Sequence, residues 1–409
     1  MQIPTVLTLK NGLKICVIPN ESVDSVTIHL RGLVGSNYEI GSEIGSAHLI
    51  EHLLIKNDQK NKIKSLGGKI VGVTSRDDVL YMVKVLKENL GDGIEFLSEI
   101  LKPIIFSKNI INNQKEVVIQ EIKRSLSMPE KAIGRLSRKI LYPRQRMAKL
   151  NTGSVEDVQR LNIKDIQKFR DRLYFPNNFI IVVSGGINVN AALKYIQKYF
   201  NNFDSGQKAP NISHKQNKKL EIQCINNSSY EKTYVKLSYY SYPLNNDLNY
   251  TVQVLATILN TYVQNLVKET LGLSYKITCE NFSSGSYGLF SIYFSSEQKN
   301  VEIILKEINR IIQNTDGLLG NRNIESVKKY IKTSRIFDFE KISLRADYYS
   351  TSLLHGRAEQ NHEYEMERIK NIKASEVKEV TKKIFSQNPK ITVLSKNLSE
   401  KDIKSWWNK

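Results

Sequence analysis

The stretch Gly45-Ser46-Ala47-His48-Leu49-Ile50-Glu51-His52-Leu53-Leu54 places two histidines and a glutamate inside an otherwise apolar segment. Its spacing predicts a helix on which His48 and His52 lie on one face, about 40° apart around the axis. Glu51 then lies about 60° to the other side of His48. Two imidazoles on one face can bind a single ion with the carboxylate beside it. The stretch therefore predicts a metal site, and a partly buried helix without a metal is the alternative.

A third metal ligand has to come from another part of the chain. The segment Gln114-Lys-Glu-Val-Val-Ile-Gln-Glu121-Ile122 offers Glu121, which on a helix shares the apolar face of Val117 and Val118. A carboxylate turned toward a core is costly unless it is paired, and a metal ion would pair with it. Two imidazoles and a carboxylate suit Zn²⁺, with one coordination position left for water. The alternative is that Glu121 is an ordinary solvated glutamate.

Composition excludes several classes of protein. With 409 residues, 40% of them hydrophobic, the chain can form two domains with proper cores. Its 60 Lys and Arg against 41 Asp and Glu give a net charge of +19, but the basic residues are scattered. No basic motif with interleaved aromatic residues occurs, so we expect no nucleic-acid partner. No segment approaches the roughly 20 apolar residues needed to cross a bilayer, so we expect no membrane association.

Cysteine usage and the start of the chain indicate the compartment. Cys16, Cys224 and Cys279 are odd in number and far apart, which argues against a disulfide framework and fits a reducing environment. The first twenty residues lack the apolar core of an export signal. We therefore expect a cytoplasmic protein, although a chain from which a leader had been removed would look the same.

Strand and helix patterns are interspersed along the whole chain, which predicts an α+β fold. Strands are expected at 7–18 around an Asn11–Gly12 turn, 25–31, 69–74, 79–86, 179–184, 233–240, 273–281 and 287–294. Helices are expected at 45–56, 88–102, 108–127, 246–268 and 298–314.

The domain boundary is expected in a polar segment near the middle of the chain. Residues 204–219 are rich in Ser, Gly, Asn, Pro and Lys and almost free of apolar residues, which is typical of a linker. We predict domains at 1–205 and 220–409, joined by a linker at 206–219. Each is expected to pack helices on a mixed sheet, and the similar order of elements suggests an ancient duplication.

Several further segments occur together with the histidine stretch and in a characteristic order. They are Leu9-Lys-Asn-Gly-Leu-Lys-Ile, Gly35-Ser36, Leu66-Gly-Gly, Thr74-Ser-Arg, Glu116-Val-Val-Ile-Gln-Glu-Ile and Leu271-Gly-Leu-Ser-Tyr275. With them the sequence resembles the pitrilysin-type zinc metallopeptidases, or inverzincins, over nearly its whole length. The branch it resembles most is the short-chain branch related to mitochondrial processing peptidase.

This resemblance implies a zinc endopeptidase that hydrolyses short or unfolded peptides. The family pattern makes His48, His52 and Glu121 the Zn²⁺ ligands and Glu51 the catalytic base. It places an extended peptide on a sheet edge near Gly72, Val73 and Thr74. Lys268 and Tyr275 would contact the peptide carbonyl or the oxyanion. For Tyr275, whose neighbours Leu273 and Ile277 lie at strand spacing, a core aromatic is the alternative.

The resemblance also implies a partner chain, because the family encloses peptides in a chamber made of two halves. A chain of 409 residues supplies one half of such a clamshell. We expect a homodimer, with a heterodimer containing a zinc-free homologous chain as the other arrangement. A scaffold or assembly subunit of the same fold, without turnover, is the rival function.

The sequence departs from the family pattern in a shorter interval, which we interpret as a local deletion that leaves Glu121 aligned, and in three substitutions that bear on efficiency and specificity more than on metal binding. The interval between His52 and Glu121 is shorter than usual, and the shortfall falls within 57–64. Gln114 replaces a glutamate that would influence the metal through its ligands. Val71-Gly72 replaces an Asn-Ala pair on the substrate strand, and Lys268 replaces an arginine, which keeps the charge but loses the planar fork.

Overall fold

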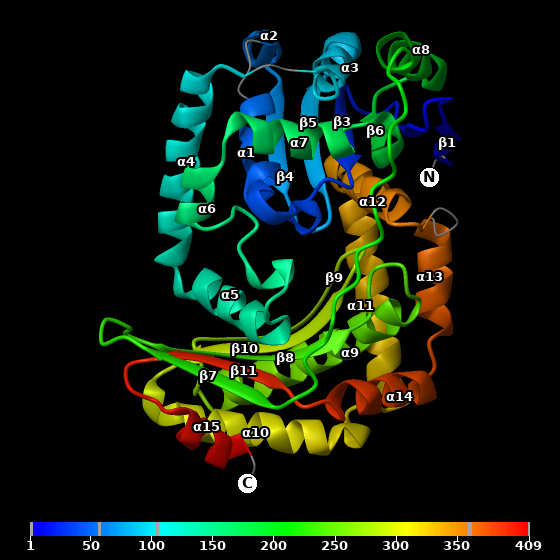
Figure 1. Ribbon diagram of the computed structural model, residues 1–409. Helices are drawn as coiled ribbons and strands as arrows, with labels where there is room; N and C mark the ends of the chain where they lie inside the picture. Colours follow the sequence, from blue (N-terminus) through cyan, green and yellow to red (C-terminus); the bar gives the residue numbers. More distant parts are fainter. Residues whose placement is uncertain (1–2, 56–58, 104–105, 358–361, 408–409) are drawn as a thin grey trace. The chain divides into compact units, whose positions relative to one another are not determined.

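The structure, a computed structural model, describes residues 3–55, 59–103, 106–357 and 362–407 (Figure 1). Contacts between Cα atoms divide the chain into two compact units. The first unit comprises Met1–Lys123, Leu150–Ile212 and Arg335–Asn361. The second unit comprises Arg124–Lys149, Ser213–Ser334 and His362–Lys409.

The first unit is built on a six-stranded mixed sheet of order β1-β2-β6-β3-β5-β4. Its strands are β1 Thr5–Thr8, β2 Lys14–Pro19, β3 Ser25–Gly32, β4 Lys69–Thr74, β5 Val79–Leu86 and β6 Phe179–Gly185. Its helices are α1 Ser46–Ile55, α2 Gln59–Ser65, α3 Leu90–Glu99, most of α4 Lys108–Leu126, α6 Val155–Arg160, α7 Ile163–Leu173, α8 Val189–Phe200 and α12 Ile342–Leu354.

The second unit is built on a five-stranded mixed sheet of order β7-β11-β8-β10-β9. Its strands are β7 Glu221–Asn226, β8 Thr233–Ser241, β9 Lys276–Ser283, β10 Gly288–Ser296 and β11 Lys390–Ser395. Its helices are α5 Pro129–Leu141, α9 Leu248–Val263, α10 Val301–Gln313, most of α11 Asn321–Glu340, α13 His362–Asn371, α14 Ala374–Phe385 and α15 Glu400–Trp407.

The two sheets share one topology once β1 is set aside. In chain order, β2 to β6 occupy the same sheet positions as β7 to β11. The parallel pair is β2 with β6 in the first unit and β7 with β11 in the second, and the other corresponding pairs are antiparallel. The predicted α+β fold with two similar mixed sheets is confirmed, and the shared topology is what a duplication would leave.

Two helical segments depart from the predicted continuous domains 1–205 and 220–409. Helix α5, from the first half of the sequence, packs on β8 and β11 of the second sheet. Helix α12, from the second half, packs on β6 and β3 of the first sheet. Each helix buries its apolar side chains on the sheet of the other half, so it joins the compact unit of that sheet. The predicted linker 206–219 contains no helix or strand.

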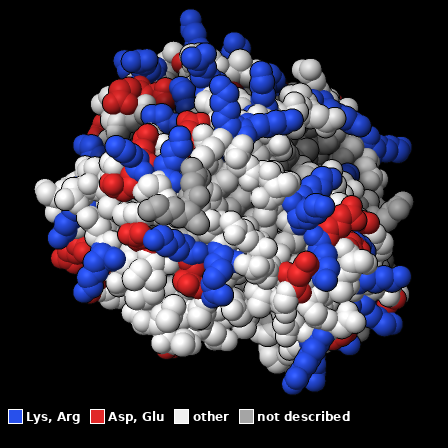
Figure 2. Space-filling view, turned by 90° about the horizontal axis from the view of Figure 1, so that it is seen from below, with Lys and Arg blue, Asp and Glu red and all other residues white. Residues whose placement is uncertain are grey.

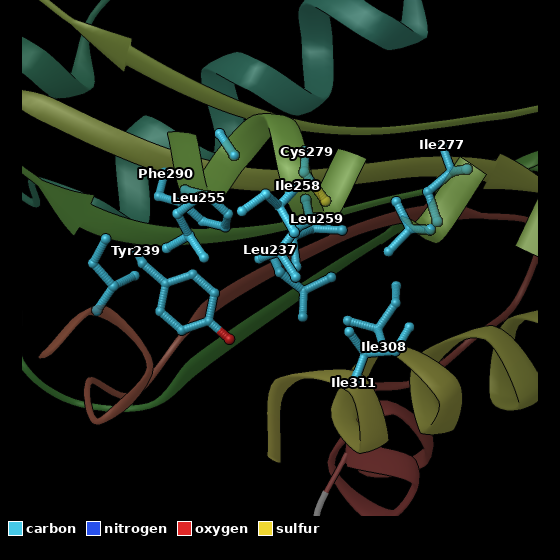
Figure 3. Close-up of a cluster of buried hydrophobic side chains, with 14 of the residues drawn as sticks. Leu237, Tyr239, Leu255, Ile258, Leu259, Ile277, Cys279, Phe290, Ile308 and Ile311 are labelled. Atoms are coloured by element: carbon cyan, nitrogen blue, oxygen red, sulfur yellow. The ribbon is translucent and has the colours of Figure 1, made fainter. Parts of the chain in front are cut away.

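Each unit has its own hydrophobic core. In the first unit, Ile180 and Val182 of β6 pack against Tyr349 and Leu353 of α12. In the second unit, a larger cluster fills the space between the sheet and helices α9 and α10 (Figure 3). Leu237, Ile277 and Phe290 contribute from its strands. Burial of such clusters is the main favourable term in the stability of each unit.

Most of the predicted elements are present with small shifts at their ends. The predicted hairpin at 7–18 forms from β1 and β2, and Gly12 between them has a φ of +86°, which glycine adopts without strain. The predicted helix at 246–268 is α9 followed by a π-helical turn over Gln264–Thr270. In the segment 57–64, where the shortfall in the interval is predicted to fall, residues 57 and 58 lie outside the described part and α2 begins at Gln59.

Three general expectations from composition, on the cysteines, on membrane spans and on the distribution of charge, can be compared with the structure. Cys16, Cys224 and Cys279 form no disulfide, as expected. Within the described ranges, no helix has the length and apolar character that crossing a bilayer would require. On the face shown in Figure 2, Lys and Arg side chains occur in separate groups with Asp and Glu between them.

A buried charged network holds the loop after β4 in the first unit. Asp78 accepts one hydrogen bond from the Arg31 guanidinium at 2.7 Å and lies 3.0 Å from the His355 ring nitrogen. Arg31 also donates to Ser350 at 3.1 Å and to Asp347, both on α12. Burial raises the pKa of Asp78, but Arg31 and His355 outweigh it and hold this pKa below its usual value. The Asp78 carboxylate is therefore charged and paired at neutral pH.

Replacing Asp78 by Asn is expected to destabilise the protein by about 1–3 kcal/mol, because the buried Arg31 charge loses one of its two carboxylate partners and keeps only the half-exposed Asp347. Since the pKa of Asp78 is lowered on folding, its contribution is fully present above the unfolded value of about 3.9 and is lost as the pH falls through the folded value. Urea unfolding should therefore show the difference at pH 7 and its narrowing below about pH 4. Asp24→Asn, which breaks an exposed pair with Lys87, should change stability little. Equal losses of unfolding free energy in Asp78→Asn and Asp24→Asn at pH 7 would contradict this prediction.

Candidate active site

Helix α1 carries the histidine stretch and is fixed on the first sheet by its apolar residues. Leu49, Ile50 and Leu54 are fully buried. The helix packs on the edge strand β4 and on α7 (Figure 1). At its start the backbone N–H of Ala47 donates to a carboxylate oxygen of Glu39 at 2.9 Å, which satisfies one of the donors that a helix leaves free. The predicted helix at 45–56 is present as α1 over Ser46–Ile55, with residue 56 outside the described part, and its polar side chains are held at β4.

The structure brings His48, His52 and Glu121 together. Glu121 Oε2 lies 3.8 Å from His48 Nε2 and 3.4 Å from His52 Nε2. One ligand atom from each residue lies within 4.8 Å of the other two. A tetrahedral zinc ion with bonds of about 2.1 Å separates its ligand atoms by about 3.4 Å. The three side chains therefore fit one zinc ion with only small movements, and no other such group of His, Cys, Asp or Glu occurs among the described residues.

The electrostatic state of His48 suits metal binding. Its burial and the neighbouring His52 lower the pKa of His48 to about 3. The ring is therefore neutral at physiological pH and keeps the nitrogen lone pair that a metal needs. The two rings lie edge to face with their centroids 4.6 Å apart, so both Nε2 atoms point toward the same region near Glu121.

Glu121 reaches the histidines from a more exposed position than the sequence indicated. Its side chain is 49% exposed, although the helical spacing predicted a carboxylate turned toward the core. The reason is that α4 buries Val118 but leaves Val117 and Glu121 at the solvent side. The argument that burial alone would demand a metal partner for Glu121 is therefore wrong. The short distances from its carboxylate to the two imidazoles are what support Glu121 as a metal ligand.

Glu51 lies beside the two histidines and is buried. Its Oε2 atom is 4.0 Å from His48 Nε2 and accepts a hydrogen bond from the Thr74 hydroxyl at 2.9 Å. The residue is 8% exposed. A carboxylate at this distance is next to the three ligand atoms without belonging to them, which is the place a general base would take.

Strand β4 forms one edge of the first sheet, and within the described part of the chain β5 is the strand with which it pairs. Its residues alternate in exposure, with Val71 at 40% and Val73 at 46%. Gly72 and Thr74 lie on the other face, toward α1. A Cβ on Gly72 would come within 2.3 Å of Glu51 Oε1 and 2.1 Å of Ile55 Cδ1. The predicted substrate strand therefore exists as an edge, and two of its residues contact the predicted base.

The remaining predicted site residues belong to the second unit and are described within it. Lys268 lies in the π-helical turn after α9, 3.1 Å from the Glu269 carboxylate. Tyr275 is 53% exposed, and the ammonium group of Lys232 lies 4.0 Å from its ring centroid. Tyr275 is thus no core aromatic, whereas its neighbour Ile277 is buried. The exposed ring of Tyr275 does not pack in the core, so the alternative of a core aromatic residue is wrong.

The family departures can be placed on the elements of the first unit. Gln114 lies on α4 two turns before Glu121 and is half-buried. Val71 lies on the exposed face of β4, where an asparagine would have offered a polar contact to a peptide. Sequence reasoning missed the contacts of Gly72 and Thr74 with Glu51. The segment Thr74-Ser-Arg was singled out, but no spacing rule connects a strand residue to a side chain on a distant helix.

This α+β protein has two sheets of one topology. The H-x-x-E-H helix packs against the edge of the first sheet, and a glutamate distant in sequence lies at its two imidazoles. Together these features define the class to which the protein belongs. The chain belongs to peptidase family M16. Residues 14–149 match the family model described as insulinase, peptidase family M16. Residues 160–319 match the model described as the peptidase M16 inactive domain. The first match contains His48, His52, Glu51 and Glu121.

Relatives and solved structures agree with this family. A protein of Rickettsia felis named as an uncharacterized zinc protease is 25% identical over 95% of this chain and 97% of its own length. The mitochondrial-processing peptidase subunit beta of Saccharomyces cerevisiae is 27% identical over 49% of this chain and 45% of its own length. The crystal structure of a protease from Helicobacter pylori has the same fold, with a TM-score of 0.89, 20% identity, and coverage of 96% of this chain and 100% of that one.

Proposed function

We propose that this protein is a zinc-dependent endopeptidase. The observation that carries the proposal is the convergence of His48, His52 and Glu121 at distances that suit one zinc ion, with Glu51 beside them. Membership of a peptidase family and zinc protease relatives support it. A subunit that had become a pure scaffold would have no reason to keep a base and three ligand groups in this geometry.

Each residue of the site has a separate role in the proposed hydrolytic reaction. When bound, zinc supplies a Lewis acid that polarises the scissile carbonyl and makes a water molecule acidic near neutral pH. The Glu51 carboxylate accepts a proton from the attacking water and afterwards gives it to the leaving amine. His48 and His52 hold the metal as neutral imidazoles, and Glu121 supplies the negative charge among the ligands.

The substrate is proposed to be a short or unfolded peptide that adds to β4 as an extra strand. An edge strand offers unpaired main-chain groups, and these select extended conformation more than sequence. Gly72, Val73 and Thr74 would provide this edge at the side of the sheet where Glu51 lies. Lys268 and Tyr275 are proposed to contact the peptide carbonyl or the oxyanion, for which the exposed Tyr275 ring is suited.

We further propose that two chains enclose the peptide, as a homodimer or with a zinc-free homologous chain. The solved periplasmic protease PqqL of Escherichia coli supports a two-half arrangement, because this chain matches 50% of its length. Three unpaired cysteines support a reducing compartment, and we propose the cytoplasm. The mass of the particle that the purified chain forms alone distinguishes the two dimers.

Peptide cleavage should depend on zinc and reverse with it. The purified protein, loaded with zinc, is expected to cut an unstructured peptide internally, as mass spectrometry of the products would show. A chelator should abolish cleavage, and stoichiometric zinc should restore it, because the three ligand side chains remain in place. The same peptide in a folded, disulfide-bonded form serves as the control and should stay intact. An uncut peptide after long incubation with fully metallated dimer would favour the scaffold function.

A further inference from the structure

We propose that Thr74 and Gly72 are positioning residues for Glu51, so that the strand that receives the peptide also sets the orientation of the base. This inference rests on the proposed function and adds a role to residues so far assigned to substrate binding. Its basis is that β4 contacts both oxygens of one carboxylate. Thr74 donates a hydrogen bond to Oε2, and the missing side chain of Gly72 makes room for Oε1.

The hydrogen bond fixes one end of the carboxylate. The Thr74 Oγ1 to Glu51 Oε2 distance of 2.9 Å is that of an ordinary hydrogen bond, and the acceptor is buried. A hydroxyl bonded to a buried carboxylate restricts rotation about the last side-chain bond of Glu51. It therefore keeps Oε2 4.0 Å from His48 Nε2 rather than allowing the group to turn away.

Gly72 makes room for the Glu51 carboxylate and does not bond to it. A Cβ at this position would overlap Glu51 Oε1 at 2.3 Å and Ile55 Cδ1 at 2.1 Å, and real Cβ contacts are longer than 3.0 Å. A methyl group at residue 72, which the family pattern carries as alanine, would require the ends of the Glu51 and Ile55 side chains to shift away from β4. The backbone of β4 does not have a positive φ at this residue, so conformational freedom does not explain the glycine. The close approach of Glu51 explains it.

Thr74 is itself held by the loop that follows it. The backbone oxygen of Ser75 accepts from Ser36 N at 3.2 Å, and that of Arg76 accepts from Asn37 N at 2.7 Å. The loop ends at Asp78, which is locked by Arg31 and His355. The hydroxyl that orients the base is therefore attached to a rigid part of the first unit. Catalytic groups need this kind of support, because small displacements cost large factors in rate.

A peptide bound at β4 would lie directly over these contacts. Its main chain would pair with the same strand whose residues 72 and 74 touch the carboxylate from the α1 face. Correct pairing of the peptide and correct placement of the base would then depend on the same six residues, Lys69–Thr74. A substitution that moves Glu51 without altering the outer edge of β4 should lower kcat and leave KM nearly unchanged.

The test compares Thr74→Val, which keeps the shape of the side chain but removes the hydroxyl, with Thr74→Ser, which keeps the hydroxyl. Thr74→Val is expected to lower kcat about 10- to 100-fold, with KM and zinc content unchanged, and Thr74→Ser to retain most of the activity. Thr8→Val makes the same change on β1 at the opposite edge of the sheet and should have no effect. Wild-type rates in Thr74→Val would overturn the inference while leaving the peptidase function intact.

A double-mutant cycle and a crystal structure complete the test. Gly72→Ala, which restores the alanine of the family pattern, should lower kcat less than Thr74→Val, because only the flexible ends of Glu51 and Ile55 have to shift. The double variant should lose less than the product of the two factors, because both changes act on one carboxylate. Fully multiplicative losses would contradict a shared target. If the zinc-loaded wild type cuts no peptide, the proposed function fails, and crystal structures then decide the inference. Glu51 should turn away from His48 in Thr74→Val and stay in Thr74→Ser, and an unmoved Glu51 in both would overturn it.

Discussion

Replacing Glu51 by Gln should lower the rate of peptide hydrolysis by orders of magnitude and leave zinc binding intact. The amide keeps the size of the side chain and can still accept the hydrogen bond from Thr74, but it cannot take a proton from water. General base catalysis contributes about 10²- to 10⁴-fold, so we expect a loss of kcat in that range. Zinc content and unfolding transition should match those of the wild type, because Glu51 is not among the three ligand groups.

The measurement is the rate of peptide cleavage at saturating peptide, taken together with the zinc content of the same sample. Glu88→Gln, an exposed change in the same unit, is the matched control and should behave as wild type. A Glu51→Gln variant that still cuts peptides at more than about a tenth of the wild-type rate would show that another group serves as the base. A variant that loses zinc as well would show that Glu51 belongs to the ligand set.

Replacing Glu121 by Gln should weaken zinc binding without destabilising the metal-free fold. Its side chain is half exposed, so the fold gains little from it, whereas its Oε2 lies close to both imidazoles. Loss of a charged ligand should weaken zinc binding by at least about 100-fold, beyond the 10- to 100-fold typical of residues that only support a ligand. Peptide cleavage at limiting zinc should fall in parallel.

Zinc-induced stabilisation measures this effect independently of activity. A ligand that binds only the folded state raises the unfolding free energy by about 2.7 kcal/mol at 100 times its dissociation constant. We expect this rise in the wild type and in Glu116→Gln, an exposed change on the same helix α4. In Glu121→Gln it should be absent at the same zinc concentration. Equal stabilisation of all three proteins would remove Glu121 from the ligand set.

Much of the fold could be predicted because local patterns decide its elements. The Asn11–Gly12 turn, the alternation in 25–31 and the helical spacing of 108–127 each correspond to an observed element. The placement of α5 and α12 could not be predicted, since an amphipathic helix does not specify which of two similar sheets it covers. A continuous division of the chain was the simplest expectation, and tertiary packing differs from it in those two segments.

Some features of the candidate site could likewise be predicted from the sequence, and others could not. The helical period predicts that His48 and His52 share a face, and the structure places their rings together. The exposure of Glu121 could not be predicted, because helical spacing places a residue beside Val117 and Val118 but not on the buried side of them. The bond between Thr74 and Glu51 joins a strand and a helix 23 residues apart, and only the folded sheet reveals it.

The central claim is that His48, His52 and Glu121 bind one zinc ion, and crystals grown with zinc test it most directly. Anomalous diffraction recorded at the zinc absorption edge should show one strong peak per chain. The peak should lie about 2.0–2.2 Å from both Nε2 atoms and from a carboxylate oxygen of Glu121. A map without a peak there, or a peak held by the histidines with Glu121 turned into solvent, would contradict the claim.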